Sequence, residues 1–322
     1  MSTAESESLS SEGLRAQFIR DVREGLSRPG QKELPSRHLY DALGSALFEA
    51  ITLLPEYGLT RADERVLSRC ARQVRERIPR DPLIVELGSG SGRKTRLLLE
   101  VFGPRPSYAP IDISSAALQQ CQKELSPLAQ VTPIHARYLD GVQRASAGRL
   151  PGQPLLLLFL GSTIGNFSPA EAATFLRALR SRLRPGDALL LGADLRKDPA
   201  RLLGAYDDPT GVTAAFNRNV LGRVNRELGG DFDLAAFTHQ ARYDQAAGRV
   251  EMHLVAQRAM DAHIPAAGLA VSLQQGETIW TESSHKFHLE DLVALTAAAA
   301  FGCEARWVDE EWPFCEALCV AA

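Results

Sequence analysis

The sequence predicts an α/β protein built on an open, mostly parallel sheet, with a second unit of different construction inserted into it. Three observations lead to this fold class. Short apolar runs alternate with helical patterns in the middle of the chain, a glycine-rich turn follows the first run, and the alternation stops between about residues 197 and 280. Strands that alternate with helices are the pattern of parallel sheets with crossover helices.

Five apolar runs have the length of buried strands and are bounded by polar or turn-forming residues. They are residues 83–87, 108–112, 131–134, 155–160 and 188–192. A helix with a well-defined start is predicted between the last two runs. Ser168 is its N-cap, Pro169 lies in its first turn and Glu171 completes a capping box.

The remaining segments divide into an insertion and the end of the sheet. Helical stretches around residues 200–221 and a strand at 249–257 predict an inserted α+β unit. A helix over 289–300, closed by Gly302, then precedes two strands at 303–308 and 314–320. We therefore expect one domain from 61–196 and 286–322 and a second from 15–60 and 197–285. We expect the acidic, polar residues 1–14 to be disordered.

The composition is that of a globular protein whose net charge is too small to favour a strongly charged partner. The 36 basic and 39 acidic residues give a net charge of −3, which favours neither nucleic acid nor an anionic membrane. No apolar run reaches the roughly 18 residues that a membrane helix needs. The N-terminus lacks the pattern of a secretory signal. Five cysteines without a C-x-x-C pair indicate reduced thiols and a cytoplasmic protein, and no histidine has metal-ligand spacing, so we expect no metal.

The glycine-rich turn after residues 83–87 allows three interpretations as a ligand site. A dinucleotide fingerprint would need glycine where Arg93 stands, and Arg93 also breaks a phosphate-binding loop despite the Lys94 that follows. The third pattern, an acidic residue followed by alternating glycines, is the first motif of S-adenosylmethionine methyltransferases. It matches at Glu86, Gly88, Gly90 and Gly92. A glycine-rich turn without a ligand is the remaining alternative.

The next predicted strand supports the methyl-donor interpretation because it ends in Asp112, about twenty residues after the turn. A carboxylate there can accept both hydroxyls of a ribose, although NAD sites use the same device. The predicted fold thus becomes a Rossmann-like, seven-stranded class I methyltransferase domain, with its last strand antiparallel and a second α+β substrate domain inserted.

A polar loop follows the fourth strand, in the segment FLGSTIGNF at residues 159–167. Ligands of open α/β sheets bind beyond the carboxyl ends of the strands, so Ser162, Thr163 and Asn166 are site candidates. Asn166 by itself is equally compatible with a turn or cap residue. Methyl transfer from a sulfonium is an in-line displacement for which the protein supplies orientation and a neutral amine. It requires no metal and no covalent nucleophile.

Several segments outside the glycine turn resemble the histidine Nα-trimethyltransferase family. They are LPEY at 54–57, FLGSTIGN at 159–166, YDD at 206–208, GVTAAFNRNV at 211–220 and TESSHKF at 281–287. The likeness runs from about residue 15 to the end and includes the insertion. It implies that S-adenosylmethionine methylates the α-amine of L-histidine three times to give hercynine, the first step of ergothioneine biosynthesis. It also implies a monomer, and the charge balance and the lack of a long apolar run lead us to expect no nucleic-acid or membrane partner.

The resemblance implies catalytic and substrate-binding roles for individual residues. Tyr57 and Asn166 hold the carboxylate and α-amine of the substrate, and Tyr40 lies near the amine. Tyr40, Tyr57 or water accepts the proton that the amine loses. Gly161 and Tyr206 lie beside these residues in the substrate site.

Further roles concern the imidazole ring and the methyl donor. Glu282 and Ser284 hydrogen-bond the imidazole, which offers one donor and one acceptor, and Met252 packs beside the ring. We expect the donor at the motif glycines and the strand end that follows, with two residues near its adenine: Gly88, Gly90, Gly92, Lys94, Asp112, Tyr138 and Asp140.

Two departures from the family pattern concern Gly58 and Arg137. Gly58 follows Tyr57 where the family often carries a second tyrosine. Arg137 replaces an acidic residue that contacts the adenine of the donor. Either Asp140 substitutes for it through a shifted loop, or Tyr138 and backbone groups hold the adenine. We expect weaker cofactor binding rather than lost activity.

Two other functions remain open at this point. One is the same chemistry on another amino acid or small amine. The other is a non-catalytic ligand-binding homologue, which Arg137 motivates. Each of these residues, taken singly, could also have a purely structural role. Tyr57, Tyr206 and Met252 could be core residues, and Glu282 could be a solvated residue of a strand.

Overall fold

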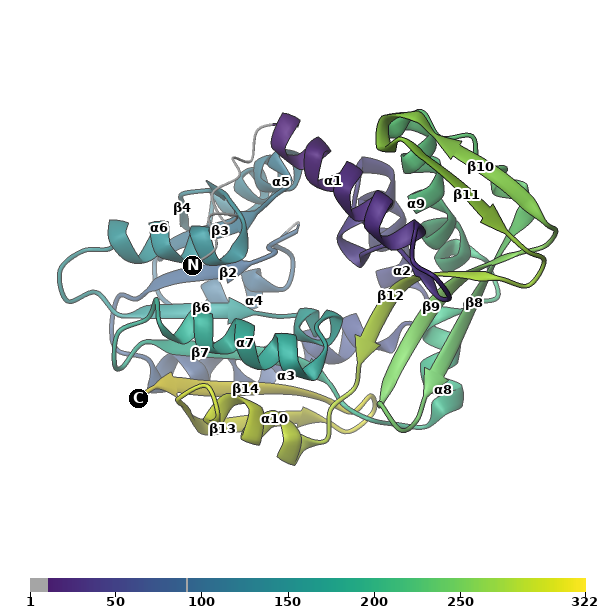
Figure 1. Cartoon of the computed structure of the whole chain (residues 1–322). Helices are drawn as coiled ribbons and strands as arrows, with labels where there is room; N and C mark the ends of the chain where they lie inside the picture. The colour runs from purple at the N-terminus through teal and green to yellow at the C-terminus, as the bar shows by residue number, and fades with distance from the viewer. Residues whose placement is uncertain (1–10, 91) are drawn as a thin grey trace. The chain divides into compact units, whose positions relative to one another are not determined.

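The computed structural model describes residues 11–90 and 92–322 of the chain (Figure 1). The chain forms two compact units. The sheet unit comprises residues 59–196 and 286–322, and the insert unit comprises the residues up to 58 together with 197–285. We expect residues 1–14 to be disordered, and residues 1–10 of this segment lie outside the described part of the chain. Residues 11–14 are helical, because α1 spans Ser11–Leu26.

The sheet unit contains an open sheet in the order β13-β14-β7-β6-β2-β3-β4, and β5 also pairs with β3. β3, β2, β6 and β7 pair in parallel, whereas β14 is antiparallel to both β7 and β13. This confirms the predicted Rossmann-like sheet and its antiparallel last strand. The strands are β2 (Leu83–Leu87), β3 (Ser107–Asp112), β4 (Gln130–Val131), β5 (Ile134–His135), β6 (Leu155–Phe159), β7 (Ala188–Asp194), β13 (Phe301–Asp309) and β14 (Phe314–Ala321).

One predicted strand, residues 131–134, is divided in the structure. β4 ends at Val131 and β5 begins at Ile134, and both pair with β3. Pro133 lies between them and has no N–H to donate to a neighbouring strand, so the pairing is interrupted there.

The two central strands form the core of the sheet unit. Every residue of β6 and β7 is buried. This is the pattern of a parallel strand covered on both faces, which carries a continuous apolar run rather than an alternating one. Burying one leucine side chain contributes roughly 2 kcal/mol, so these runs anchor the strand ends at which site residues are expected.

Helices cover both faces of this sheet, with α7 in front of it and α3 behind it in Figure 1. The capping box of α7 is confirmed, since Ser168 Oγ accepts from Glu171 N and Glu171 Oε2 accepts from Ser168 N. The helices are α3 (Gly58–Arg77), α4 (Thr95–Leu99), α5 (Ser115–Leu125), α6 (Tyr138–Gly148), α7 (Pro169–Arg180), α10 (Leu289–Ala297) and the 3-10 turn η2 (Thr163–Asn166).

The prediction that Gly302 closes the last helix is wrong. α10 ends at Ala297, and Gly302 lies within β13. Ala300 takes the left-handed backbone conformation at the turn, with φ of 60°. An alanine-rich run is compatible with helix up to the turn, and the pairing of β13 with β14 determines where the helix has to stop.

The insert unit combines a four-stranded sheet with helices. Its sheet has the order β1-β12-β9-β8, and β10 and β11 form a separate hairpin. The strands are β1 (Lys32–Glu33), β8 (Phe237–Asp244), β9 (Arg249–Ala256), β10 (Met260–Ile264), β11 (Leu269–Leu273) and β12 (Thr278–His285). β9 confirms the strand predicted at 249–257.

The helices of the insert unit pack through apolar stripes. In α1, Phe18, Val22 and Leu26 are four residues apart and all buried. The stretch predicted around 200–221 is two helices, α8 and α9, because Gly211 has φ of 78° and begins a new helix. The helical elements are α1, η1 (Ser36–Leu39), α2 (Ala42–Leu53), α8 (Pro199–Tyr206), α9 (Val212–Leu228), η3 (Leu234–Ala236) and η4 (Pro265–Ala267).

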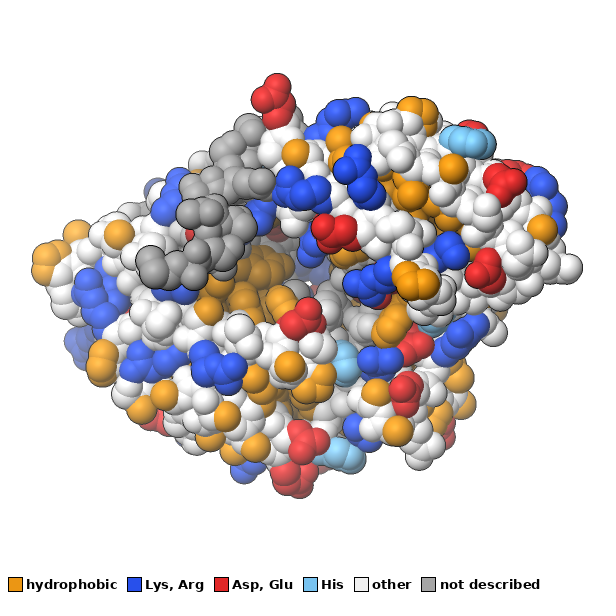
Figure 2. All heavy atoms as spheres, in the orientation of Figure 1, with side chains coloured by type: hydrophobic (Ala, Val, Ile, Leu, Met, Phe, Trp, Pro, Cys, Tyr) orange, Lys and Arg blue, Asp and Glu red, His pale blue; other side chains and the backbone are white. Residues whose placement is uncertain are grey.

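On the face shown in Figure 2, acidic and basic side chains lie intermixed. Among the described residues, no helix combines the length and apolar character needed to span a membrane.

Candidate functional site

The glycine turn between β2 and α4 has an open backbone face. Gly90 has φ of 50°, and a Cβ built on it would meet no atom of a described residue within 4 Å. Gly92 has φ of 74°, and its Cβ would lie 2.6 Å from Leu125 Cδ1 of α5. Gly92 therefore allows close packing beneath the turn, whereas Gly90 leaves room for a ligand to approach the main chain.

Glu86 ties the base of this turn together from a fully buried position. Its Oε2 accepts a 2.6 Å hydrogen bond from Thr95 Oγ1 at the start of α4 and a second one from the Tyr108 hydroxyl of β3. Burial raises the pKa of the Glu86 carboxyl to about 7, although both hydrogen bonds oppose the shift. The acidic residue of the motif thus holds the turn from below.

Asp112 lies at the carboxyl end of β3, next to the turn. Its Oδ1 accepts from Ser114 N at 2.8 Å, and the carboxyl is also hydrogen-bonded by the backbone of Gly90. Burial raises the pKa of Asp112 above its ordinary value. A carboxylate beside an open glycine backbone fits the ribose of a nucleoside-type ligand.

Lys94 and Gly161 share one hydrogen-bond partner, Asp63, which is not among the site residues predicted from the sequence. Lys94 Nζ donates to Asp63 Oδ2 at 2.7 Å, and Gly161 N donates to the same oxygen at 3.0 Å. Gly161 has φ of 71°, and a Cβ there would lie 2.7 Å from Lys94 Nζ. Asp63 stands in a charged helix as one more acidic residue, so local sequence contains no signal for this role.

The loop after β6 is held by a buried polar network of the sheet unit. Ser162 is left-handed with φ of 61°, and its Oγ accepts from Asp194 N at 2.9 Å. The Asp194 carboxylate accepts from Trp312 Nε1 at 2.9 Å and pairs with the buried Lys286 at 3.0 Å. Asn166 is partly exposed at the end of η2. This network fixes the loop that presents Asn166.

Tyr138 and Asp140 occupy different environments at the start of α6. Tyr138 packs its ring against Phe159 and Phe175, and its hydroxyl lies 3.0 Å from the position a Gly88 Cβ would take. Asp140 is exposed in the first helical turn, and Arg137 is the N-cap residue. The structure thus brings Tyr138 to the glycine turn, and it leaves the side chain of Asp140 exposed.

In the insert unit, β12 places Glu282 and Ser284 on one face, because alternate residues of a strand point the same way. Glu282 pairs with Met252 of β9 across the sheet. Ser284 Oγ accepts a 2.7 Å hydrogen bond from the Tyr206 hydroxyl at the end of α8. Glu282, Ser284 and Tyr206 are each at most 8% exposed. Three predicted polar residues therefore lie together as one buried cluster beside a fourth predicted residue, Met252.

The tyrosines form a continuous aromatic series within the same unit. Tyr57 lies edge-on to Tyr206 with ring centroids 6.2 Å apart. Phe48 contacts Tyr57 at 6.2 Å and Tyr40 at 5.5 Å. The series connects all three tyrosines predicted near the substrate.

His239 and Asn217 support Tyr206, and the sequence reasoning assigned them no role. His239 Nε2 lies 2.7 Å from Tyr206 O, and Asn217 Nδ2 lies 2.9 Å from His239 Nδ1. Since the carbonyl only accepts and the amide nitrogen only donates, the ring is neutral and carries its proton on Nε2. Burial lowers the pKa of His239, which agrees with this neutral form.

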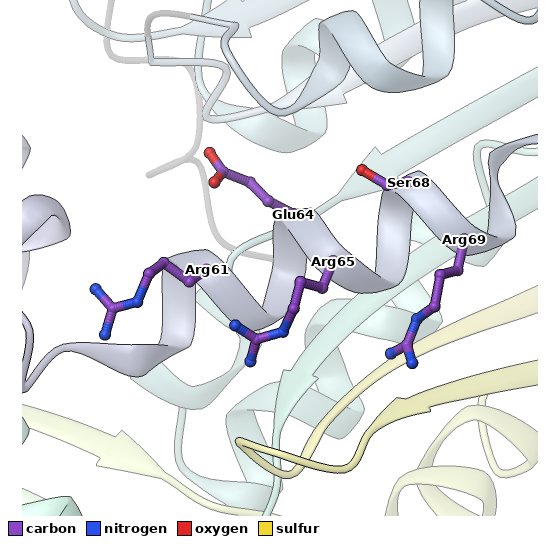
Figure 3. A pocket seen from close by; sticks show the side chains of 5 residues that line it. All are labelled: Arg61, Glu64, Arg65, Ser68 and Arg69. Atoms are coloured by element: carbon purple, nitrogen blue, oxygen red, sulfur yellow. The ribbon is translucent and has the colours of Figure 1, made fainter.

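A cavity of about 510 Å³ lies against α3 (Figure 3). Its lining residues Arg61, Glu64, Arg65, Ser68 and Arg69 include none of the predicted site residues. Arg65 and Arg69 pair with Asp309, and Glu64 pairs with Arg93. The charges around this cavity therefore already have partners in the protein.

The five cysteines are free thiols. Within residues 11–90 and 92–322, no group of three or more His, Cys, Asp or Glu side chains is arranged to hold a metal ion.

Comparison with known proteins identifies relatives along nearly the whole chain. A family model described as histidine-specific, S-adenosylmethionine-dependent methyltransferase matches residues 18–321. Histidine N-alpha-methyltransferase of Mycolicibacterium smegmatis is 42% identical over 94% of this chain and 94% of its own length. The protein of that name from Mycobacterium tuberculosis is 43% identical over 92% of each chain. Ergothioneine biosynthesis protein 1 of Neurospora crassa is 31% identical over 87% of this chain, a match that covers 32% of the relative.

Proposed function

Because the chain belongs to the histidine-specific, S-adenosylmethionine-dependent methyltransferase family, we propose that it methylates the α-amine of L-histidine. The proposed product is hercynine, formed by three successive transfers as the first step of ergothioneine biosynthesis. The observation that carries the choice of substrate is the buried cluster of Glu282, Ser284 and Tyr206.

The methyl donor would be held by groups of the sheet unit. The open backbone at Gly90 fits close approach of the ligand, the Asp112 carboxylate fits its ribose, and the Lys94 ammonium fits the carboxylate of its methionine part. Gly88, Gly92 and Tyr138 shape the turn. When bound, S-adenosylmethionine supplies an electrophilic methyl group on a sulfonium.

The imidazole of the substrate fits the Glu282–Ser284 pair. A carboxylate accepts from the ring N–H, and a hydroxyl that already accepts from Tyr206 can donate its own proton to the other ring nitrogen. Met252 beside Glu282 offers an apolar contact for the ring. An apolar side chain in place of imidazole would offer neither group a hydrogen-bonding atom, which penalises such substrates strongly.

The α-amine must be neutral before each transfer, and every transfer releases one proton. Tyr57 and Asn166 are proposed to hold the amine and carboxylate, with Gly161 and Tyr40 alongside. Tyr40 or Tyr57 can relay the proton to water, since a phenol both donates and accepts hydrogen bonds. We also propose that the insert unit is the substrate-binding domain.

The test is incubation of the protein with L-histidine and S-adenosylmethionine, followed by mass spectrometry. Mono-, di- and trimethylated histidine should appear in succession. Methylation of a different amine, with histidine unmodified, would favour a changed substrate.

Binding of S-adenosylhomocysteine should be measured by calorimetry in parallel. Absence of both binding and turnover would favour a non-catalytic homologue. We further propose that the protein is a monomer and that it is cytoplasmic, which is consistent with its free thiols. We propose that it needs no metal, so a chelator should leave its activity unchanged.

A further inference from the structure

Asp63 occupies an unusual position in the sheet unit. It is 0% exposed on α3, and one of its oxygens, Oδ2, accepts from both Lys94 Nζ and Gly161 N. The first donor begins the helix after the glycine turn, and the second begins the loop that leads to Asn166. A single carboxylate oxygen therefore joins two segments 67 residues apart (94 to 161) that are both assigned to ligand binding.

A second carboxyl group, Glu316 of β14, lies beneath Asp63. It is 0% exposed, and its side chain is within hydrogen-bonding reach of Asp63. Its Oε1 packs against Gly192 of β7, where a Cβ would lie only 2.6 Å away. Among the described residues, neither Glu316 oxygen nor Asp63 Oδ1 accepts from another donor. Two carboxyl groups can hydrogen-bond to each other only when one of them carries a proton.

The charges around the pair identify which group is protonated. Burial raises the pKa of Glu316 well above its ordinary range, and the negative charge of Asp63 adds to the shift. Burial alone would lower the pKa of Lys94, but Asp63 outweighs it and the pKa is raised. Glu86 and Cys70 are the other titratable groups that act on this cluster. Burial and charge thus favour a neutral Glu316 that can donate to Asp63, beside the ion pair that Asp63 forms with Lys94.

We propose that Asp63 and Glu316 are a positioning pair that holds Lys94 Nζ and the Gly161 turn in place for the amino-acid end of the methyl donor. This proposal rests on the function proposed above in one respect: the ligand is taken to be S-adenosylmethionine. An ammonium has three N–H donors, and the bond to Asp63 uses one of them. The other two can meet a carboxylate, provided that the flexible lysine side chain is held in one orientation.

The test is a set of matched variants whose affinity for S-adenosylhomocysteine is measured by calorimetry. Asp63→Asn should weaken binding about tenfold, the factor expected when a charge-assisted hydrogen bond that fixes Lys94 becomes a neutral one. Glu316→Gln should stay within about twofold of wild type, because its amide N–H still donates to Asp63. Glu316→Leu removes that donor and should approach the loss seen for Asp63→Asn.

A double-mutant cycle separates positioning from general damage. In a Lys94→Met background, Asp63→Asn should cause no further loss of affinity, because the asparagine oxygen still accepts from Gly161 N and the lost charge acts only on Lys94. Additive losses, or an Asp63→Asn variant that binds like wild type, would overturn the proposal. Asp187→Asn is the control, since Asp187 is a buried carboxylate of the same unit paired with Arg149 instead. It should reduce stability and leave affinity unchanged.

Two further measurements keep the proposal testable if Asp63→Asn fails to fold. At a pH well above the value of about 7 to which burial raises the pKa of Glu86, the infrared band of a protonated carboxylic acid should be present in wild type and absent in Glu316→Gln; its absence from wild type would contradict the pair. A wild type that binds S-adenosylhomocysteine but leaves histidine unmethylated would contradict the proposed function and leave the positioning pair intact.

Discussion

The sheet unit and the insert unit build their proposed binding groups in different ways. In the sheet unit, the groups proposed for the methyl donor lie mainly within residues 86–112, at the ends of two adjacent strands, and the backbone conformation of three glycines shapes the turn. In the insert unit, the groups proposed for histidine come from α8, β9 and β12 and from residues 40–57, and side-chain contacts assemble them.

This difference predicts different sensitivities to substitution. A backbone-built site should respond to any added Cβ through strain, with stability and ligand binding lost together. A side-chain-built site should respond only where a hydrogen-bonding group is removed, with affinity lost and the fold retained. Substitutions in each unit, with matched controls, test this distinction.

The largest effect is expected for Gly92→Ala. Its left-handed backbone costs an alanine roughly 1–2 kcal/mol, and a Cβ only 2.6 Å from Leu125 adds about 1–3 kcal/mol of overpacking. Denaturant unfolding should show the sum as lost stability, accompanied by loss of S-adenosylhomocysteine binding. Gly152→Ala is the control, because Gly152 also has φ of 74° but a Cβ built there would meet no atom within 4 Å among residues 11–90 and 92–322. It should lose only the strain; equal losses would contradict the packing role of Gly92.

Glu282→Ala should produce the next largest effect, this time on substrate alone. It removes the charged acceptor for imidazole, which is worth roughly 2–3 kcal/mol, so the KM for histidine should rise by about two orders of magnitude. Calorimetry with S-adenosylhomocysteine should give nearly wild-type affinity. Ser283→Ala, on the opposite face of β12, should change neither quantity. A parallel loss of both affinities in Glu282→Ala would show that the two sites are not built independently.

A smaller effect is expected for Tyr206→Phe. The substitution removes the hydroxyl that donates to Ser284 Oγ and leaves the ring in contact with Tyr57. One neutral hydrogen bond contributes about 1 kcal/mol, so histidine affinity should fall about fivefold. Steady-state kinetics checks this, with Tyr243→Phe on β8 as control. An unchanged KM would mean that Tyr206 does not orient Ser284 for the substrate.

The smallest expected effects are pH-dependent and have opposite signs in the two units. Burial lowers the folded-state pKa of His239, so the unfolded chain binds more protons below the ordinary value of 6.5 and stability falls on acidification. Burial raises the pKa of Glu86 from 4.5 to about 7, so the folded chain holds more protons between these values and stability falls as pH rises. Denaturant unfolding across this range should show His239→Gln and Glu86→Gln changing the slope of stability against pH in opposite directions. Changes of the same sign would contradict one of the two assignments.

Much of the sheet unit could be predicted from the sequence because its signals are local. The apolar runs of β2, β3, β6 and β7 and the Ser168 capping box lie within a few residues of one another. β8 was missed because its segment, FTHQARYD, has few apolar side chains, and only Phe237 of it is buried. It becomes a strand through pairing with β9.

The supporting polar residues could not be predicted because their partners are distant in sequence. Asp63 meets Gly161 across 98 residues, and Asn217 joins the strand pair β8 and β9 through His239 and His253 O. A lone aspartate on a charged helix and a lone histidine in a polar strand carry no local pattern. Their roles follow only from the positions into which the two units fold.

The measurement that tests the central proposal most directly is a single reaction with isotopically labelled methyl donor and equal concentrations of L-histidine and other amino acids. Fragmentation of the products by mass spectrometry locates the label. We expect label on the histidine α-nitrogen, accumulating through one, two and three methyl groups. Label on the imidazole ring, on another amino acid, or on no product would contradict it.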